Sequence, residues 1–269
     1  MITKAGDILE GYKLQEEIGR GGTAIVWSVA SQSHDYKVPL ALKMFTPDIV
    51  LHPESVKEIK SQFLKQKGIK HPSILPPLKL LDIEGVPAVL FEKADRSLYN
   101  QLKSLRKNNH SAGFKEELIV DILLDISEGL EYLHNMDMAH NDVKTDNVLV
   151  FDKGGNKFRL CDLDTSVTLR ATIMRLTTKS NEKSDIHFTP LYVSPEKKDA
   201  IGRGGYAFFD AKKSDIFSLG VMAMELCTVL SMPAEQMIEN GTLKAIVNRL
   251  SAIHTQVPAY EIILSLIHI

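Results

Sequence analysis

Cysteine is nearly absent from the sequence. Cys161 and Cys227 are its two cysteines, and their positions show no paired spacing. A disulfide framework needs several cysteines, and a zinc site needs cysteines or histidines at short, regular intervals. The sequence favours neither. We therefore expect a protein of a reducing compartment, the cytoplasm or the nucleus, where thiols remain free.

An excess of charge of one sign is also lacking. The 269 residues include 32 Lys and Arg and 34 Asp and Glu, which gives a formal net charge of −2. This balance argues against a dedicated nucleic-acid binder and against a binder of anionic membranes. The apolar share of 44% and the charged share of 25% are ordinary for a soluble globular protein. The length suits two moderate domains or one large two-lobed domain.

Long apolar runs are missing as well. The longest stretch, "IFSLGVMAMELCTVLSM", is interrupted by Glu225 and is short for a membrane span. We interpret it as a buried core helix. The N-terminal "MITKAGDILEGYKL" lacks the apolar core of a signal peptide and has no glycine at position 2 for myristoylation. No membrane association is expected.

Hydrophobic periodicity divides the chain in two. Residues 12–92 alternate in the manner of strands, with one polar helix at "HPESVKEIKSQFLKQKGI". After residue 97 the period becomes helical. The helix predicted in "FKEELIVDILLDISEGLEYLHNM" has apolar residues at Leu118, Ile119, Ile122, Leu123, Ile126, Leu130 and Leu133. A second, apolar helix is predicted over residues 213–230. A small strand-rich lobe therefore precedes a larger helical lobe, an α+β arrangement, with the join at residues 92–97.

Two features of the first lobe could contact phosphates. "IGRGGTAIV" sets Gly19, Gly21 and Gly22 between two strands, and glycines let backbone N–H groups approach an anion. The simpler interpretation is a plain hairpin turn. Neither a P-loop nor a dinucleotide turn fits, because no Gly-Lys-Ser/Thr occurs and a strand follows. Lys43 in "LALKMF" is either a lysine that extends to solvent or an inward cation, with Ala41 and Val26 packing a flat ring.

A third feature, "HNDVKTDNVLV", concentrates polar groups before an apolar strand. Asp142 could accept a proton from a hydroxyl, Lys144 could neutralise a transferring phosphoryl group, and Asn147 could bind a metal. Asp162 follows at the end of the strand in "LCDLD". Amide and carboxylate oxygens suit Mg²⁺, which takes few protein ligands alongside phosphates. Taken alone, the stretch could equally be a solvated loop in which aspartates cap turns.

The order of these features resembles the protein kinase family, of Ser/Thr type. The glycine hairpin, strand lysine, Asp-x-Lys-x-x-Asn stretch and strand-terminal aspartate follow one another as they do in that family. "TPLYVSPE" (189–196) is similar to the end of an activation segment, and "SDIFSLGV" resembles the helix whose aspartate, Asp215, supports the catalytic loop. Lys144 and Thr189 match the Ser/Thr pattern. The resemblance covers the chain from Tyr12 to at least Leu230.

The resemblance implies a two-lobed kinase domain over residues 12–263, with lobes at about 12–92 and 98–263 and a hinge at 92–97. It implies ATP and Mg²⁺ as cofactors, proteins with Ser or Thr hydroxyls as substrates, Asp142 and Lys144 as catalytic residues, and Asn147 and Asp162 as metal ligands. The residues implied to contact ATP are Ile18, Gly19, Gly21, Gly22, Val26, Ala41, Lys43, Glu92, Ala94 and Leu149.

Several positions depart from the family pattern. Ala24 replaces the third glycine of the hairpin, and Asp164 replaces the glycine of the metal-binding triplet. Asn141 replaces the arginine before Asp142, and Asp185 stands at the usual phosphorylation position. Both halves of a phosphate-operated switch are therefore missing, which favours constitutive competence.

The acidic partner of Lys43 is the most consequential departure. The position that usually supplies it holds Gln62, and Glu58 lies one helical turn earlier. We expect Glu58 to pair with Lys43, with a neutral contact from Gln62 as the alternative. A pseudokinase, acting as a nucleotide-binding or scaffolding module, is the alternative function. Small-molecule phosphotransferases rank third, because they generally lack the "SPE" and "SDIFSLG" elements.

The C-terminal residues raise a separate expectation. "LSLIHI", residues 264–269, equals one reading frame of a sequencing adapter, and the family's last helices would follow this point. We therefore expect a truncated domain with a non-native tail. We also expect that a chain without those helices exposes apolar surface and aggregates.

Overall fold

The computed structural model divides the chain into two compact units, Met1–Asp95 (unit 1) and Arg96–Ile269 (unit 2). The structure describes residues 3–33, 35–46, 53–107, 116–153, 157–163, 167–168, 192–202 and 209–227. Positions outside these residues include Asp164, Asp185, Thr189 and the segment 228–269, with its expected truncation and tail.

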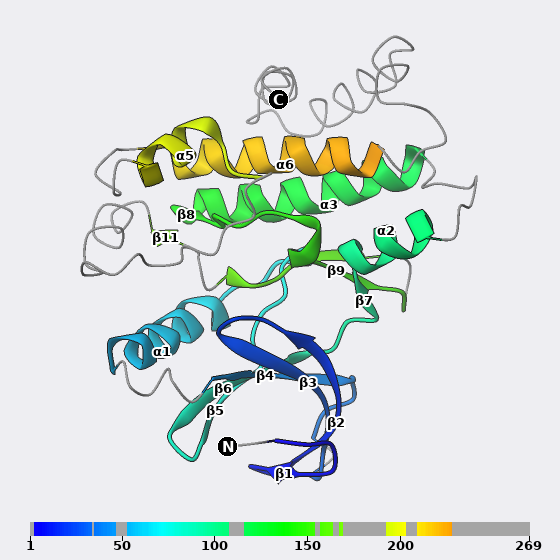
Figure 1. Cartoon of the computed structure of the whole chain (residues 1–269), viewed down its shortest axis with the longest axis vertical. Helices are drawn as coiled ribbons and strands as arrows, with labels where there is room; N and C mark the ends of the chain where they lie inside the picture. Colours follow the sequence, from blue (N-terminus) through cyan, green and yellow to red (C-terminus); the bar gives the residue numbers. More distant parts are fainter. Residues whose placement is uncertain are drawn as a thin grey trace. The chain divides into compact units, whose positions relative to one another are not determined.

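Unit 1 is built on an antiparallel sheet (Figure 1). Its strands are β1 (Ile8–Leu9), β2 (Tyr12–Arg20), β3 (Ala24–Ser31), β4 (Leu40–Phe45), β5 (Lys79–Ile83) and β6 (Val86–Glu92). They form a six-stranded sheet in the order β1-β2-β3-β4-β6-β5. Helix α1 (Pro53–Lys67) is the helix described in this unit. The strand-rich first lobe predicted from the alternation is therefore present.

Apolar residues cover both faces of this sheet. One face forms a cluster that includes Leu14, Trp27, Leu42 and Leu90. On the other face Phe63 of α1 packs with Ala24, Phe45 and Val89. Because side chains alternate across a strand, neighbouring residues of β4 and β6 contribute to different clusters. Apolar clusters thus lie on both faces of the sheet, and Phe63 of α1 contributes to one of them.

The β5–β6 hairpin shows how local sequence sets the strand register. Glu84 and Gly85 have φ values of 53° and 85°, and Ile83 pairs with Val86 across them. Two consecutive positive φ values give a two-residue turn whose twist matches the strands. The Asp82 carboxylate accepts a hydrogen bond of 2.7 Å from the Gly85 N–H. The turn thus fixes which residues of β6 face each cluster.

Unit 2 combines helices with two small sheets. Its elements are β7 (Arg96–Ser97), α2 (Leu98–Lys107), α3 (Glu116–Asn135), β8 (Met138–Ala139), η2 (Thr145–Asn147), β9 (Val148–Phe151), β10 (Lys157–Leu160), β11 (Val167–Thr168), α5 (Pro195–Gly202) and α6 (Ala211–Cys227). One sheet has the order β10-β9-β7, and the other pairs β11 with β8.

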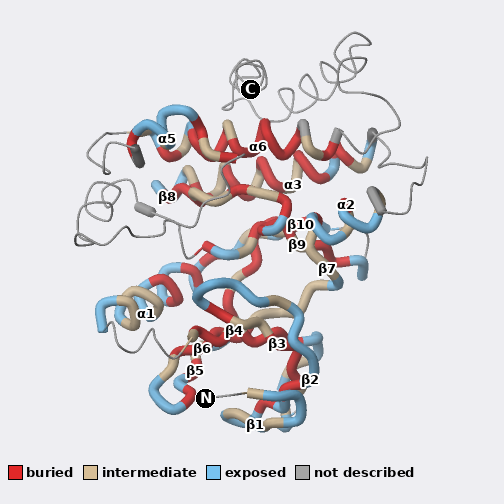
Figure 2. The backbone as a smooth tube through the Cα atoms, viewed as in Figure 1, coloured by how far each residue is buried: buried red, intermediate tan, exposed pale blue. Residues whose placement is uncertain are grey.

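Helices α3 and α6 lie side by side in the core of unit 2 (Figures 1 and 2). The apolar stripe predicted for α3 is buried, with Ile119, Ile122, Leu123 and Ile126 at 0% exposure. It packs in one cluster with residues of α6 such as Met222. Burial of this kind contributes about 25 cal/mol per Å² of apolar surface. The packed helices α3 and α6 therefore provide a stable core next to the segment that follows α3.

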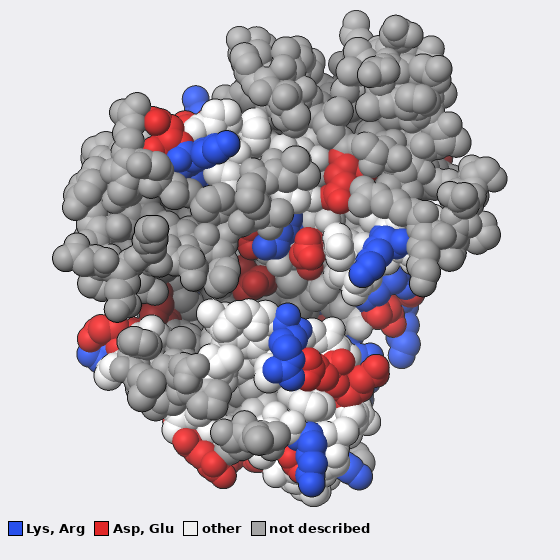
Figure 3. All heavy atoms as spheres, viewed as in Figure 1, with Lys and Arg blue, Asp and Glu red and all other residues white. Residues whose placement is uncertain are grey.

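The described surface carries mixed charge. On the face drawn in Figure 3, Lys and Arg side chains lie among Asp and Glu side chains. This agrees with the formal net charge of −2. Within the described part of the chain, no helix is long and apolar enough to cross a membrane.

Candidate active site

The predicted catalytic loop, residues 140–147, connects β8 to β9 and ends in the short helix η2. Asn141 has a φ of 68°, in the left-handed region that most side chains avoid. Asparagine tolerates this conformation better than most residues because its short polar side chain can bond locally. Asn141, which replaces the arginine of the family pattern, is therefore well suited to the backbone conformation at this position.

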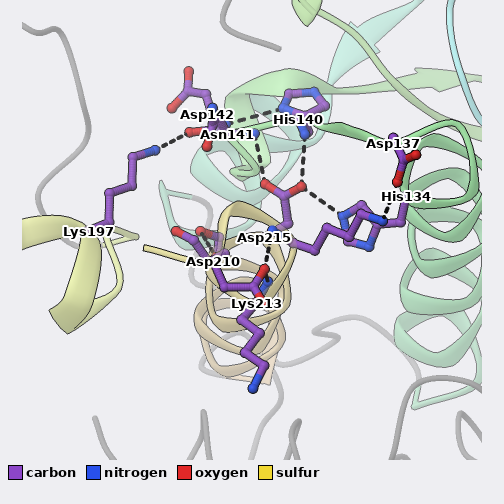
Figure 4. A network of polar contacts seen from close by, with 12 residues as sticks. His134, Asp137, His140, Asn141, Asp142, Lys197, Asp210, Lys213 and Asp215 are labelled. Carbon is purple, nitrogen blue, oxygen red and sulfur yellow. Dashed lines mark hydrogen bonds and ion pairs between the residues drawn. The ribbon is translucent and has the colours of Figure 1, made fainter. Parts of the chain in front are cut away.

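A buried carboxylate on α6 holds the beginning of this loop (Figure 4). Asp215 is 1% exposed, and its oxygens accept hydrogen bonds from the backbone N–H groups of His140 (2.8 Å) and Asn141 (2.7 Å). A third contact, of 2.9 Å, joins it to Nε2 of His134 at the end of α3. A buried charge is stable only when it is paired or hydrogen-bonded. The supporting role predicted for Asp215 thus has its structural basis here.

His140 joins the catalytic loop to the strand that precedes Asp162. Its ring is fully buried, with Nε2 3.0 Å from the Cys161 carbonyl oxygen and Nδ1 accepting from the Asp142 N–H at 3.3 Å. These partners assign the proton to Nε2, since Nδ1 must be the acceptor. The two predicted carboxylates, Asp142 and Asp162, are therefore connected through one buried imidazole and its neighbours.

Three predicted site residues meet directly. Nζ of Lys144 lies 2.7 Å from Oδ2 of Asp142. The Asn147 amide Nδ2 donates to the same Oδ2 at 2.9 Å and to the Asp142 carbonyl oxygen at 2.8 Å. Both partners donate to Oδ2, so the carboxylate is fixed in one orientation. Among the described residues, no hydrogen bond to its Oδ1 is recorded, so this oxygen remains able to accept a proton.

The predicted metal ligands lie at the ends of neighbouring strands. Asp162 follows β10 with a φ of 63°, and Asn147 precedes β9, the strand paired with β10. The Cys161 N–H donates to the Asn147 carbonyl oxygen at 2.9 Å. Both recorded bonds of the Asn147 amide use Nδ2, which leaves Oδ1 as a ligand atom of the type Mg²⁺ prefers. No group of three or more His, Cys, Asp and Glu able to hold a metal occurs among the described residues. The two predicted metal ligands are the amide of Asn147 and the carboxylate of Asp162.

A second polar cluster was missed from the sequence. Thr145 of the catalytic loop donates from Oγ1 to Glu225 of α6 at 3.0 Å, and the Tyr192 hydroxyl donates to the same carboxylate. Burial, reinforced by the bond to Glu225, raises the pKa of Tyr192 above its ordinary value. Ser218 anchors the Tyr192 carbonyl at 2.8 Å. The signal was available, because Glu225 is the charge that interrupts the apolar run.

Two of the predicted phosphate contacts of unit 1, Gly19 and Lys43, lie in one row across the sheet with Val26, which was predicted to pack a flat ring. Gly19 pairs with Val26, Val26 with Lys43, and Lys43 with Val89. Directly paired residues place their side chains on the same face, so Val26 and Lys43 share a face. Nζ of Lys43 lies 5.5 Å from the centre of the Phe45 ring.

The other residues predicted to contact ATP lie on strands or in the turns and segments next to them. Ala41 pairs with Phe91, and Gly21 donates to the Ala24 carbonyl at the hairpin tip. The remaining members are Ile18 on β2, Gly22 in the hairpin turn, Glu92 at the end of β6, Ala94 beyond it, and Leu149 on β9 in unit 2. The predicted contacts are thus divided between the two units. Their common role stays a prediction.

The acidic partner of Lys43 also stays a prediction. Gln62 is 2% exposed on α1, and its amide donates to Oε1 of Glu58 at 2.8 Å. Both residues proposed as partners therefore lie on one face of the helix, one turn apart. A buried neutral amide orients the carboxylate next to it.

Comparison with known proteins agrees with this geometry. Residues 12–263 match the family model of the protein kinase domain. Germinal center kinase 3 of Caenorhabditis elegans is 27% identical over 231 residues, which cover 81% of this chain and 35% of that protein. Serine/threonine-protein kinase SRK2B of Arabidopsis thaliana is 22% identical, over 94% of this chain and 63% of its own length. The chain thus spans less than two thirds of either relative.

A solved structure extends the likeness to the fold. A double mutant of the PknI kinase domain of Mycobacterium tuberculosis superposes with a TM-score of 0.65, at 18% identity and 99% coverage of both chains. This confirms the predicted two-lobed kinase fold. Because the family model spans most of the sequence, the predicted family is confirmed too, and the chain belongs to the protein kinase domain family.

Proposed function

We propose that this chain is the catalytic domain of an ATP-dependent protein Ser/Thr kinase. One observation supports the proposal above all others. Asp142 has Oδ2 fixed by Lys144 and Asn147 and its backbone N–H by His140. A scaffold has no physical need for a carboxylate held this firmly, with no hydrogen bond to its other oxygen from any residue that the structure describes. Preorganisation of this kind lowers a barrier because no reorganisation is needed during reaction.

The proposed reaction transfers the terminal phosphoryl group of ATP to a hydroxyl. Oδ1 of Asp142 orients the substrate Ser or Thr and accepts its proton as the hydroxyl oxygen bonds to phosphorus. The bond between that phosphorus and the bridging oxygen breaks, and ADP leaves with the electron pair. Lys144 neutralises negative charge on the phosphate oxygens.

Magnesium would be held by Asn147 and Asp162. It would supply charge neutralisation on the phosphates and orient them for in-line transfer. The protein's own contribution is to hold the Asn147 side chain through its two bonds to Asp142, and to join the chain segments that carry Asn147 and Asp162 through the backbone bond from Cys161. The substrates we propose are proteins, as the relatives' names indicate for those kinases. We also propose a cytoplasmic location, in keeping with the two cysteines of the sequence, whose positions show no paired spacing.

The deciding experiment is phosphorylation of a generic protein substrate with Mg²⁺ and radiolabelled ATP. We expect label on Ser and Thr, and none with D162A, which removes the carboxylate ligand. Nucleotide affinity of D162A should no longer respond to Mg²⁺ in a thermal-shift titration. Tight ATP binding without transfer to any substrate would favour the pseudokinase alternative, for which the comparisons offer no support over the kinase.

A further inference from the structure

Lys197, near the start of α5, contacts the backbone beside Asp142 (Figure 4). Its Nζ donates a hydrogen bond of 2.5 Å to the carbonyl oxygen of Asn141. The two residues are 56 positions apart in the sequence. The ammonium group also lies 6.0 Å from the centre of the Phe209 ring. It is therefore directed at the catalytic loop.

Charged groups from two elements surround this ammonium. Asp142 and Lys144 belong to the catalytic loop and Asp215 belongs to α6. Burial lowers the pKa of Lys197 from the ordinary lysine value, while Asp215 and Asp142 act in the opposite direction and Lys144 adds to the lowering. The protonated form is thus held by hydrogen bonding and two carboxylates in a place where solvation is poor.

The contact completes the restraint of Asn141. Its N–H is fixed by Asp215 at 2.7 Å and its carbonyl by Lys197, so both peptide groups that flank the residue are held. With φ at 68°, Asn141 occupies a conformation that needs support from its surroundings. The carbonyl of Asn141 belongs to the peptide whose N–H is that of Asp142. Rotation of that peptide would move the Asp142 side chain.

We infer that Lys197 is a positioning residue, which sets the orientation of the catalytic carboxylate by holding the Asn141 carbonyl from α5. The inference rests on the proposed kinase function. It assigns Lys197 no contact with substrate or nucleotide. Its effect should therefore be found in turnover rather than in the KM for ATP.

The experiment compares K197M, K197R and the control K198M, which changes the neighbouring exposed lysine of α5. We expect K197M to lower kcat by about 10- to 100-fold, the size of a lost hydrogen bond from a charged donor. The KM for ATP should change little. K197R retains the donor and the charge, so it should recover most of the lost turnover, and K198M should behave as the parent.

A pH profile separates positioning from mere structural support. In the parent, kcat should fall on the alkaline side as Lys197 loses its proton, below the pH at which an ordinary lysine titrates. Because arginine stays protonated throughout, K197R should shift that fall to higher pH. A K197M variant with parental kcat would overturn the inference. The inference would also be overturned if kcat of K197R fell at the same alkaline pH as kcat of the parent. It would likewise be overturned if the loss of kcat in the variants simply followed their loss of melting temperature.

Hydrogen exchange gives a readout independent of activity. Peptides that cover residues 140–144 should exchange faster in K197M than in K198M, because one anchor of the loop is removed. Equal exchange in the two variants contradicts the inference. If the parent shows no kinase activity, the proposed function fails, and the exchange comparison alone decides whether Lys197 restrains the loop.

Discussion

Each unit of the chain has a buried polar side chain on a helix, and the two are held in different ways. Asp215 of α6 is 1% exposed and Gln62 of α1 is 2% exposed. The carboxylate of Asp215 accepts bonds from residues 74, 75 and 81 positions away. The amide of Gln62 donates to Glu58, four positions away on its own helix.

The difference shows where each unit obtains its functional geometry. In unit 2 the loop that contains Asp142 has little regular structure, and a distant buried charge determines its path. In unit 1 strand pairing places the candidate phosphate contact Lys43 beside Val26, the residue predicted to pack a flat ring. Loss of the buried group should therefore be felt in the loop of unit 2 more than in the sheet of unit 1.

The largest effect should come from the residue that the unit 2 network orients. D142N keeps the size of the side chain but removes the proton acceptor. We expect kcat to fall by roughly 10²–10⁴, the range for loss of a general base, with nucleotide affinity nearly intact. Steady-state kinetics and a nucleotide titration measure the two quantities. An equal loss of ATP binding would show that Asp142 is structural.

The next effect concerns Asp215 itself. In D215N one oxygen becomes an NH₂ group that cannot accept from a backbone N–H, so at least one buried donor loses its partner. We expect the free energy of unfolding to fall by about 1–3 kcal/mol and turnover to fall with it. Denaturant unfolding and kinetics test this.

The matched control for D215N is D210N, five residues earlier. Asp210 accepts from the Lys212 and Lys213 N–H groups at the start of α6. Asparagine caps helices as well as aspartate does, so D210N should change stability by only a few tenths of a kcal/mol. If D215N and D210N lost the same free energy of unfolding, the buried bonds of Asp215 would contribute no more to stability than the bonds of Asp210.

Replacement of the buried neutral amide of Gln62 in unit 1 by a carboxylate should have a smaller effect on stability, and this effect should depend on pH. Q62E sets a second carboxylate within hydrogen-bonding distance of Glu58, which raises the pKa of the pair. We expect a loss of about 1–2 kcal/mol at neutral pH. A carboxyl group whose pKa is raised in the folded state lowers the free energy of unfolding at pH values above its pKa in the unfolded state, which is about 4.3 for glutamate. The loss should therefore shrink as the pH falls toward 5.

The control for this experiment is Q62M, an apolar replacement of similar volume whose effect should not depend on pH. Melting curves at both pH values provide the comparison. If Q62E is more stable or more active than the parent, its carboxylate has found a cation. Lys43 would then be the partner. Positions 62 and 215 would in that case both hold a buried carboxylate bonded to residues distant in the sequence.

The smallest effect should follow removal of any phosphate from the purified protein. Asn141 cannot form the charge-assisted pair that an activation-segment phosphate would use, and Lys197 is engaged with the Asn141 carbonyl. Phosphatase treatment should leave kinase activity nearly unchanged. A tenfold or larger drop would mean that another cation of the chain receives a phosphate at Thr177, Thr178 or Ser180.

Sequence patterns predicted the regular parts of this molecule well. The period of apolar residues located α3, and the alternation in residues 12–92 located the sheet, because both depend on neighbours within a few residues. The predicted helix over residues 213–230 is α6, described to Cys227. The order of short motifs led to the kinase family. Each of these inferences uses information that is local in the chain.

The amino-acid sequence by itself thus determined the elements, the family and the identity of Asp142, Lys144 and Asn147 as candidate site residues. The family resemblance also predicted that Asp215 supports the catalytic loop. Tertiary structure decided which atoms hold the loop: the contacts of Asp215 with His140 and of Lys197 with Asn141 join residues 75 and 56 positions apart. No periodicity links such positions. Their proximity results from the packing of the unit 2 helices, which brings a buried carboxylate and a lysine to one loop.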